Sequence, residues 1–377
     1  MRLMQVNLQK GFGGGEIYTC FLGRALRELG QPFDLIVHRN ATWWREYDTG
    51  ATRIHAVSGF EEIASLPFQR PAWLVYHTPD GGERLSILKS QGCRLASFVH
   101  LPTYQRRIGH LRDYDLLVAV SGYVLSGLRE NGLNNVHGEP LYGIAHLDRG
   151  SAHTGPLMAT SRFSWDTRKL RDRALGWIYP IWQGVRPSRA YSRRKGLTLG
   201  VVSRITPIKQ FPALFRLLAP VLARHADVTV DIFGSGGYAS IRDTAQALAP
   251  MNGRVRWWGE QRDVRQVYGV LDYLLTGLPE KEALGLNVIE AQMCGTPVLA
   301  PDAPPFRETI EHGRTGYLYP DPRSDGASGF ATLIDGLLSG TYARPDPLLA
   351  KAHLARFEGP AFQERVAHLL AAFRAAS

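Results

Sequence analysis

Short apolar segments alternate with helical segments along this chain in two successive series, and this alternation most constrains the fold. In the first series we expect strands at residues 3–7, 33–37, 72–77, 94–100, 116–120 and 177–181, with a first helix over 17–29. In the second series we expect strands at residues 197–202, 227–233, 255–258, 273–276 and 298–300, with a helix over 211–224. Strands that alternate with helices favour parallel sheets. The sequence therefore predicts an α/β fold class with two doubly wound parallel sheets.

The length of the chain supports the same division. At 377 residues the chain is too long for one ordinary hydrophobic core. Residues 183–196 are rich in Arg, Ser and Pro and form the expected linker. We therefore predict an N-terminal Rossmann-like domain over residues 1–185 and a C-terminal Rossmann-like domain over residues 186–359.

The composition argues against several classes of protein. No apolar run approaches the length of a membrane span, and residues 1–9 lack the apolar core of a signal peptide. Cys20, Cys93 and Cys294 have neither an even count nor CxxC spacing, so neither a disulfide framework nor a structural zinc site is indicated. We expect a cytoplasmic protein.

The positive charge is concentrated in residues 162–195. This segment holds ten Arg or Lys residues against two Asp residues, a net charge of +8 out of a total of +10, and it also contains three Trp residues. Such a surface could rest on anionic lipid headgroups at the membrane or hold an acidic acceptor. A solvated face between domains explains it equally well. We expect no nucleic acid partner, because no DNA- or RNA-binding signature accompanies the charge.

Two carboxylates, Glu282 and Glu290, lie eight positions apart across a glycine turn and the start of a helix. Gly285 lets the backbone approach a ligand closely, and the free amides of the following helix favour an anion. One carboxylate on either side of that turn could bind hydroxyl groups on both sides of a diphosphate, as in a nucleotide-sugar site. The alternative is a helix that carries Glu290 on its solvated face, with Glu282 as an ordinary loop acid near a helix N-terminus.

A strand expected to end at residue 202 delivers Arg204, and the following turn presents Lys209. A planar guanidinium and a compact ammonium suit a diphosphate leaving group, because they offset the negative charge that grows as the bond breaks. Two ordinary surface cations are the alternative.

A glycine-rich turn follows one strand in each of the two predicted sheets. Gly13, Gly14 and Gly15 stand between the first strand and the first helix, where open parallel sheets bind ligands. Their spacing is neither GxGxxG nor that of a P-loop, so a flexible connection is the alternative to a phosphate cradle. Gly234 lies in a second glycine-rich turn after the strand at 227–233.

In combination these elements resemble the retaining glycosyltransferases of the GT-B fold, family four, also called glycosyl transferases group 1. Glu282 to Glu290 is similar to the E-x7-E segment of that family, and residues 203–210 resemble its G-R-x-x-x-x-K-G element, with Ser203 and Gln210 in place of the two glycines. The resemblance implies two Rossmann-like domains that face a central cleft. It also implies a C-terminal helix, within residues 360–377, that completes the first domain.

The resemblance further implies roles for individual residues. Glu290 would bind the ribose hydroxyls, Glu282 would orient the donor sugar, and the cations would hold the diphosphate. His100, which follows a strand, would lie near the donor sugar, although His77 is a rival in a similar context and a structural role is common for such a residue. The expected catalytic residues are Glu282, Arg204, Lys209 and His100. The expected donor-binding residues are Gly13, Gly14, Gly15, Gly234, Gly285, Leu286, Asn287 and Glu290.

Apart from Asp113-Tyr114-Asp115, which directly precedes the strand expected at 116–120, no Asp-x-Asp triplet occurs, and no histidines are paired at ligand spacing. We therefore expect no obligatory metal and no cofactor beside the nucleoside diphosphate sugar. The expected reaction is sugar transfer with retention to a saccharide, lipid-linked or small-molecule acceptor, in bacterial polysaccharide or lipid-linked saccharide biosynthesis. A natural-product glycosyltransferase, a nucleotide-sugar epimerase or hydrolase, and an inactive membrane-associated scaffold remain alternatives. The basic segment would favour a peripheral location at the inner face of the cell membrane.

Overall fold

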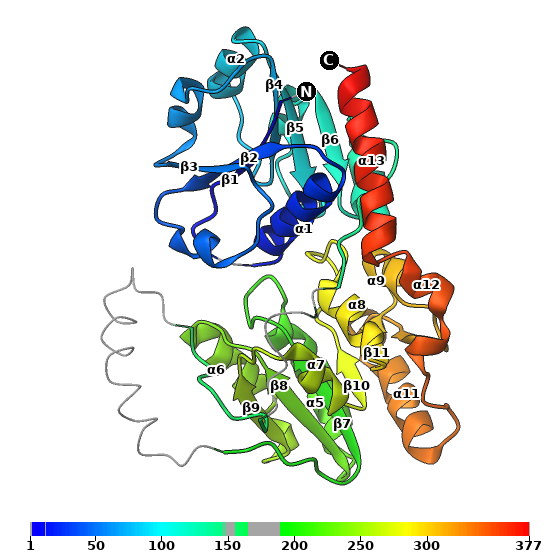
Figure 1. Cartoon of the computed structure of the whole chain (residues 1–377). Helices are drawn as coiled ribbons and strands as arrows, with labels where there is room; N and C mark the ends of the chain where they lie inside the picture. Colours follow the sequence, from blue (N-terminus) through cyan, green and yellow to red (C-terminus); the bar gives the residue numbers. More distant parts are fainter. Residues whose placement is uncertain (1, 12, 146, 148–154, 165–188, 377) are drawn as a thin grey trace. The chain divides into compact units, whose positions relative to one another are not determined.

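The computed structural model describes residues 2–11, 13–145, 147, 155–164 and 189–376, and these form two compact units (Figure 1). Unit 1 comprises Met1–Ile144, Glu282–Leu286 and Ala355–Ser377. Unit 2 comprises Ala145–Lys281 and Asn287–Leu354. Each unit has its own sheet, and each is described separately below.

The described part of unit 1 contains one six-stranded sheet in the order β3-β2-β1-β4-β5-β6, and every neighbouring pair is parallel. Its strands are β1 (Leu3–Asn7), β2 (Phe33–His38), β3 (Arg53–Val57), β4 (Ala72–Tyr76), β5 (Cys93–Val99) and β6 (Leu116–Ala119). The central strands β1, β2 and β4 are buried throughout, as expected for a parallel sheet that is covered on both faces. The strand order reverses between β1 and β4, which is the position where such sheets bind ligands.

The helices of unit 1 include one from the far end of the chain. They are α1 (Gly14–Glu28), α2 (Glu83–Ser90), α3 (Gly122–Glu130) and α13 (Gly359–Ala375), with 3-10 helices η1 (Thr42–Glu46), η2 (Phe60–Ser65) and η3 (Gly109–Asp113). Helix α13, red in Figure 1, packs beside α1 and buries Phe362 and Val366 in the same core. Trp73 of β4 stacks on Phe373, with ring centroids 4.4 Å apart, and its indole Nε1 donates to the Phe373 carbonyl at 3.2 Å. The C-terminal helix is therefore part of the hydrophobic core of unit 1.

The described part of unit 2 also contains a parallel six-stranded sheet, in the order β12-β11-β10-β7-β8-β9. Its strands are β7 (Leu197–Val202), β8 (Val228–Phe233), β9 (Val255–Gly259), β10 (Tyr273–Leu275), β11 (Val298–Pro301) and β12 (Gly316–Tyr319). The other elements are α5 (Phe211–Ala223), α6 (Tyr238–Ala247), η4 (Ala249–Met251), α7 (Val264–Gly269), α8 (Leu286–Met293), α9 (Pro304–Thr309), α10 (Pro322–Asp325), α11 (Ser328–Ser339), η5 (Pro347–Leu349) and α12 (Lys351–Ala355). Here the strand order reverses between β7 and β10.

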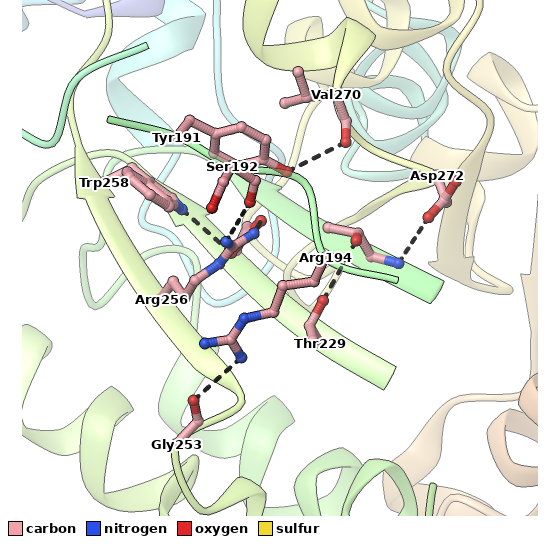
Figure 2. A network of polar contacts seen from close by, with 11 residues as sticks. Tyr191, Ser192, Arg194, Thr229, Gly253, Arg256, Trp258, Val270 and Asp272 are labelled. Carbon is pink, nitrogen blue, oxygen red and sulfur yellow. Dashed lines mark hydrogen bonds and ion pairs between the residues drawn. The ribbon is translucent and has the colours of Figure 1, made fainter. Parts of the chain in front are cut away.

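Arg256 ties the segment before β7 to the sheet of unit 2 through the Ser192 carbonyl (Figure 2). Arg256 of β9 and Asp231 of β8 form two hydrogen bonds, of 2.6 Å and 2.5 Å, and both side chains are almost fully buried. Arg256 also donates from Nη1 to the Ser192 carbonyl at 2.6 Å, and Trp258 donates from Nε1 to Asp231 at 3.2 Å. A buried charge pair is tolerated only when its remaining hydrogen-bonding groups find partners, and this network supplies them.

The predicted α/β architecture of two doubly wound parallel sheets is confirmed. The bounds of β1 and β7 agree with the prediction at both ends. The edge strands β3 and β12 were not predicted; β3 is mostly exposed and polar, so it lacks the apolar run that identifies a buried strand. The strand expected at residues 177–181 lies outside the described residues, and the domain bounds expected at 1–185 and 186–359 stay a prediction.

Candidate functional site

The reversal of strand order in unit 2 brings three chemistry-bearing segments to one edge of its sheet. The loop after β7 carries Arg204 and Lys209, the turn after β8 contains Gly234, and α8 connects β10 to β11. Because the strands are parallel, all three segments follow the carboxyl ends of strands, where ligands of such sheets bind. This edge is the candidate site of unit 2.

The loop after β7 packs directly against the turn after β8. The Ser203 amide donates to the Phe233 carbonyl at 3.0 Å, and the Ile205 amide donates to the Ser235 carbonyl at 2.9 Å. Gly234 has φ of +145°, and a Cβ there would lie 2.0 Å from the Ser203 carbonyl oxygen. A glycine is therefore needed at this position so that the two backbones can approach, and the position of Arg204 depends on that packing.

The second half of the same loop contains Gln210, whose backbone adopts a conformation that favours glycine. Gln210 has φ of +54° and ψ of +27°, in the left-handed region. Its amide Nε2 donates to Glu280 Oε2 at 3.0 Å. Lys209, immediately before it, is half-buried, and its amide donates to the Thr206 carbonyl at 3.1 Å. The loop thus retains a glycine-like turn although it lacks the glycine that the family element has there.

Glu290 lies in the middle of α8 and is only 4% exposed. The Tyr268 hydroxyl of α7 donates to its Oε2 at 3.0 Å. The alternative that placed Glu290 on the solvated face of a helix is therefore wrong. Asn287, in the first turn, donates from Nδ2 to the Val202 carbonyl at 3.1 Å, which joins the start of α8 to the end of β7. Tyr268 could not be recognised from the sequence, since nothing in the spacing pairs it with Glu290.

Glu282, Gly285 and Leu286 belong to unit 1. Glu282 Oε1 accepts a hydrogen bond from the Gly285 amide at 3.1 Å, and Gly285 has φ of +81°. The carboxylate thus stabilises the turn before α8. This contact occupies one carboxylate oxygen, and a role of Glu282 toward the donor sugar stays a prediction.

The glycine-rich segment of unit 1 starts α1. Gly13 precedes the helix, and Gly14 and Gly15 are its first residues. A Cβ on Gly15 would meet no described atom within 4 Å, and one on Gly14 would make an ordinary contact of 3.9 Å with Leu286. Crowding among the described residues therefore does not explain these glycines. Glu16, 5% exposed, places a carboxylate in the first turn, where the helix dipole stabilises negative charge.

His100 and His77 prove to be hydrogen-bonded partners and not rivals. His77 follows β4, His100 follows β5, and His77 Nδ1 lies 3.1 Å from His100 Nε2. His77 Nε2 lies 2.8 Å from Oε1 of Gln5 in β1. Burial lowers the pKa of His100 to about 4. Burial, and secondly the neighbouring His100, lower the pKa of His77 well below its ordinary value. Both rings are therefore neutral near pH 7.

Within residues 2–11, 13–145, 147, 155–164 and 189–376, no group of three or more His, Cys, Asp or Glu side chains is placed to hold a metal ion. In the same part of the chain, no helix combines the length and apolar character that crossing a bilayer requires.

Comparison with known proteins extends these observations. Residues 196–339 match the family model described as glycosyl transferases group 1. The phosphatidyl-myo-inositol mannosyltransferase of Mycolicibacterium smegmatis is 30% identical over 154 residues, which are 40% of this chain and 38% of that protein. The N-acetyl-alpha-D-glucosaminyl L-malate synthase of Bacillus anthracis is 40% identical over 118 residues, which are 31% of this chain and 30% of that protein. The matches thus span about a third of the length of these curated relatives.

Solved structures match over nearly the whole chain. Anabaena Alr3699/HepE in complex with UDP and glucose has a TM-score of 0.69 at 16% identity, covering 98% of this chain and 99% of that one. Sucrose-phosphate synthase from Thermosynechococcus elongatus has a TM-score of 0.70 at 16% identity, and the match covers 100% of both chains. At this identity the likeness defines the fold.

Proposed function

Since this chain is a GT-B protein of the glycosyl transferases group 1 family, we propose that it transfers a sugar from a nucleoside diphosphate sugar to an acceptor hydroxyl. The anomeric configuration would be retained, as the family resemblance implies. The acceptor would be a saccharide or a lipid-linked saccharide of bacterial origin. UDP is the first nucleotide to test, because the structure of Alr3699/HepE contains it.

The observation that carries the proposal is the loop after β7, which presents Arg204 and Lys209 at the point where the strand order of unit 2 reverses. The loop is fixed by backbone hydrogen bonds at one end and by the contact between Gln210 and Glu280 at the other. Preorganised cations stabilise a leaving diphosphate without having to reorient during the reaction. They would thus fill the electrostatic role that a divalent metal has in other nucleotide-sugar enzymes.

Glu290 would bind the ribose hydroxyls of the donor. The Tyr268 hydroxyl holds its carboxylate in place, and α8, which carries it, follows β10 next to the strand that precedes the cations. A carboxylate that is fixed before the ligand arrives accepts two neighbouring hydroxyl groups at little entropic cost. Asn287 would contribute through the start of α8, since its side chain is bonded to Val202.

The acceptor proton would move to an oxygen of the departing phosphate on the same face of the sugar. His100 is neutral, and a pKa of about 4 makes it a weak base, so it would orient a hydroxyl group without removing its proton. Glu282, Gly285 and Leu286 would lie near the donor sugar and phosphates, as would Gly13, Gly14 and Gly15.

The proposal is tested by thermal-shift titration with UDP, GDP, ADP and their common sugars, without added metal. A ligand at about one hundred times its dissociation constant adds about 2.7 kcal/mol to the stability of the folded state. We expect one nucleotide to raise the Tm of the wild type and of Glu260→Gln, a change of an exposed acid in unit 2. Glu290→Gln, which keeps the shape of the side chain, should abolish most of the shift. No shift with any nucleotide would contradict the proposal.

A further inference from the structure

Three polar side chains form a hydrogen-bonded chain at the point where the strand order of unit 1 reverses. Gln5 lies in β1, His77 directly follows β4, and His100 directly follows β5. The contacts are 2.8 Å from Gln5 Oε1 to His77 Nε2 and 3.1 Å from His77 Nδ1 to His100 Nε2. The chain therefore leads from a fully buried amide, 0% exposed, to the half-buried His100 at the sheet edge.

Aromatic packing fixes the two imidazole rings. His77 stacks on Phe98, with ring centroids 5.1 Å apart and an interplanar angle of 1°. Tyr18 packs edge-on against His100, with ring centroids 5.1 Å apart, and its hydroxyl donates to the Leu141 carbonyl at 2.6 Å. The rings cannot turn without disturbing this packing, so their nitrogen atoms stay directed along the chain.

The orientation of the Gln5 amide, with its oxygen toward His77, sets the direction in which the hydrogen bonds run. Gln5 presents its oxygen, which can only accept, so His77 Nε2 must carry the proton. A neutral imidazole has one proton, which leaves His77 Nδ1 as an acceptor. His100 Nε2 must therefore donate to it, and His100 Nδ1 is left without a proton.

We propose that Gln5 and His77 are positioning residues that set the tautomer of His100, so that its Nδ1 is a fixed hydrogen-bond acceptor for a hydroxyl group of the sugar or of the acceptor. This role deepens the proposed sugar transfer and rests on it. In a functional histidine, the hydrogen bond made by one ring nitrogen commonly sets which of the two ring nitrogens carries the proton. Here the orienting group is a second histidine, whose own tautomer is set by a buried amide.

The first test observes the tautomers directly and does not depend on activity. The ¹⁵N chemical shifts of the histidine rings in the full-length protein distinguish protonated from bare nitrogens, and His77→Phe and His100→Gln assign the signals. In the wild type at pH 7 we expect His100 to carry its proton on Nε2 and His77 to carry its proton on Nε2. In Gln5→Leu both signals should shift toward a mixture of tautomers. A wild-type His100 with its proton on Nδ1 would overturn the proposal.

The second test separates positioning from folding. His77→Phe keeps a ring to stack on Phe98 and removes both hydrogen bonds, whereas His77→Asn keeps an acceptor near the position of Nδ1. For sugar transfer, or for donor hydrolysis if no acceptor is found, we expect kcat to fall about tenfold in His77→Phe, the effect of losing one hydrogen bond. The affinity for the nucleotide alone should stay within twofold, and His77→Asn should recover most of the loss. Equal losses in both variants, or a parallel loss of nucleotide affinity, would indicate a purely structural role.

The two tests also distinguish this proposal from the proposed function. If no nucleotide binds and no transfer occurs while the tautomers are as expected, the sugar-transfer function fails and the hydrogen-bonded chain stands. If transfer occurs but the tautomer of His100 does not change in Gln5→Leu and His77→Phe, the function stands and the positioning role is refuted.

Discussion

Gln210 is held in a left-handed backbone conformation by a hydrogen bond from its side-chain amide to Glu280, at 3.0 Å. Glu280 is itself paired with Arg323, so the contact is part of a polar network on unit 2. A left-handed conformation costs a residue other than glycine about 1–2 kcal/mol. The side-chain hydrogen bond offsets part of that cost and keeps Lys209 in its turn.

Substitution of Gln210 should therefore separate backbone strain from the side-chain contact. Gln210→Gly loses the hydrogen bond but relieves the strain, so the free energy of unfolding should change by less than about 1 kcal/mol. Gln210→Val loses the hydrogen bond and keeps the strain, and it should destabilise the protein by about 2 kcal/mol and weaken nucleotide binding through Lys209. Urea denaturation and nucleotide titration measure the two effects. Equal stability of the two variants would contradict this account of the turn.

Gly234 should be intolerant of any side chain, because a Cβ would lie 2.0 Å from the Ser203 carbonyl oxygen. We expect Gly234→Ala to cost more than about 2 kcal/mol of stability and to displace Arg204, with a loss of nucleotide affinity. Gly269→Ala is the matched control, since this glycine is exposed at the end of α7 and a Cβ there meets no described atom within 4 Å. It should change the unfolding free energy by less than about 0.5 kcal/mol. A similar loss in both variants would refute the packing argument.

The strands and the types of residue at the candidate site could be predicted from the sequence. The hydrogen-bond partners of those residues could not. A single sequence displays local patterns, such as the apolar runs of β1 and β7 and the spacing of Glu282 and Glu290. The partners of these residues depend on strand order and helix packing. His77 and His100 directly follow two adjacent strands, and Tyr268 reaches Glu290 from another helix. Such contacts join residues 22 or 23 positions apart without any periodic signal, so sequence reasoning treated the histidines as rivals and missed Tyr268.

Tyr268 should contribute to nucleotide affinity although it is predicted to act only through Glu290. Tyr268→Phe removes the hydroxyl that donates to Glu290 Oε2 and leaves a buried carboxylate oxygen with one hydrogen bond fewer. We expect nucleotide affinity, measured by calorimetry, to fall about three- to tenfold, less than the full effect of one hydrogen bond to a charged group because Tyr268 acts through Glu290. Tyr317→Phe is the control, because it removes a hydroxyl that donates to the Ala343 carbonyl at 2.7 Å elsewhere in unit 2. If both variants bind equally well, Tyr268 does not orient Glu290.

The pair of His77 and His100 should make the free energy of unfolding fall in acid. The unfolded chain takes up a proton at each histidine near pH 6.5, whereas burial lowers the pKa of His100 in the folded state to about 4 and lowers that of His77 as well. Between about pH 4 and 6.5 the unfolded state binds more protons than the folded state. The free energy of unfolding therefore decreases as the pH falls through this range. Each histidine contributes a slope of at most about 1.4 kcal/mol per pH unit.

This pH dependence is measured by urea denaturation of the wild type and of His77→Phe at pH 7, 6 and 5. His77→Phe removes one of the two buried groups, so its stability should decline less steeply below pH 6.5 than that of the wild type. His110→Gln, a change at an exposed histidine of unit 1, should keep the wild-type slope. A wild-type slope in His77→Phe would show that His77 is already protonated in the folded state or titrates alike in both states.

Removing one partner of the buried pair of Asp231 and Arg256 should lower the free energy of unfolding strongly. Replacing both partners by apolar residues should lower it much less. Asp231→Ala leaves the Arg256 guanidinium buried without its counter-charge, and it should destabilise the protein by about 3–5 kcal/mol. The double variant of Asp231→Leu and Arg256→Met removes both charges and fills their volume, so it should recover most of that loss. Urea denaturation of the three proteins decides between two views of the network. Recovery would mean that desolvation of the charges cancels their attraction, whereas a further loss in the double variant would mean that the bond from Arg256 to the Ser192 carbonyl, at 2.6 Å, contributes net stability by holding that segment on the sheet.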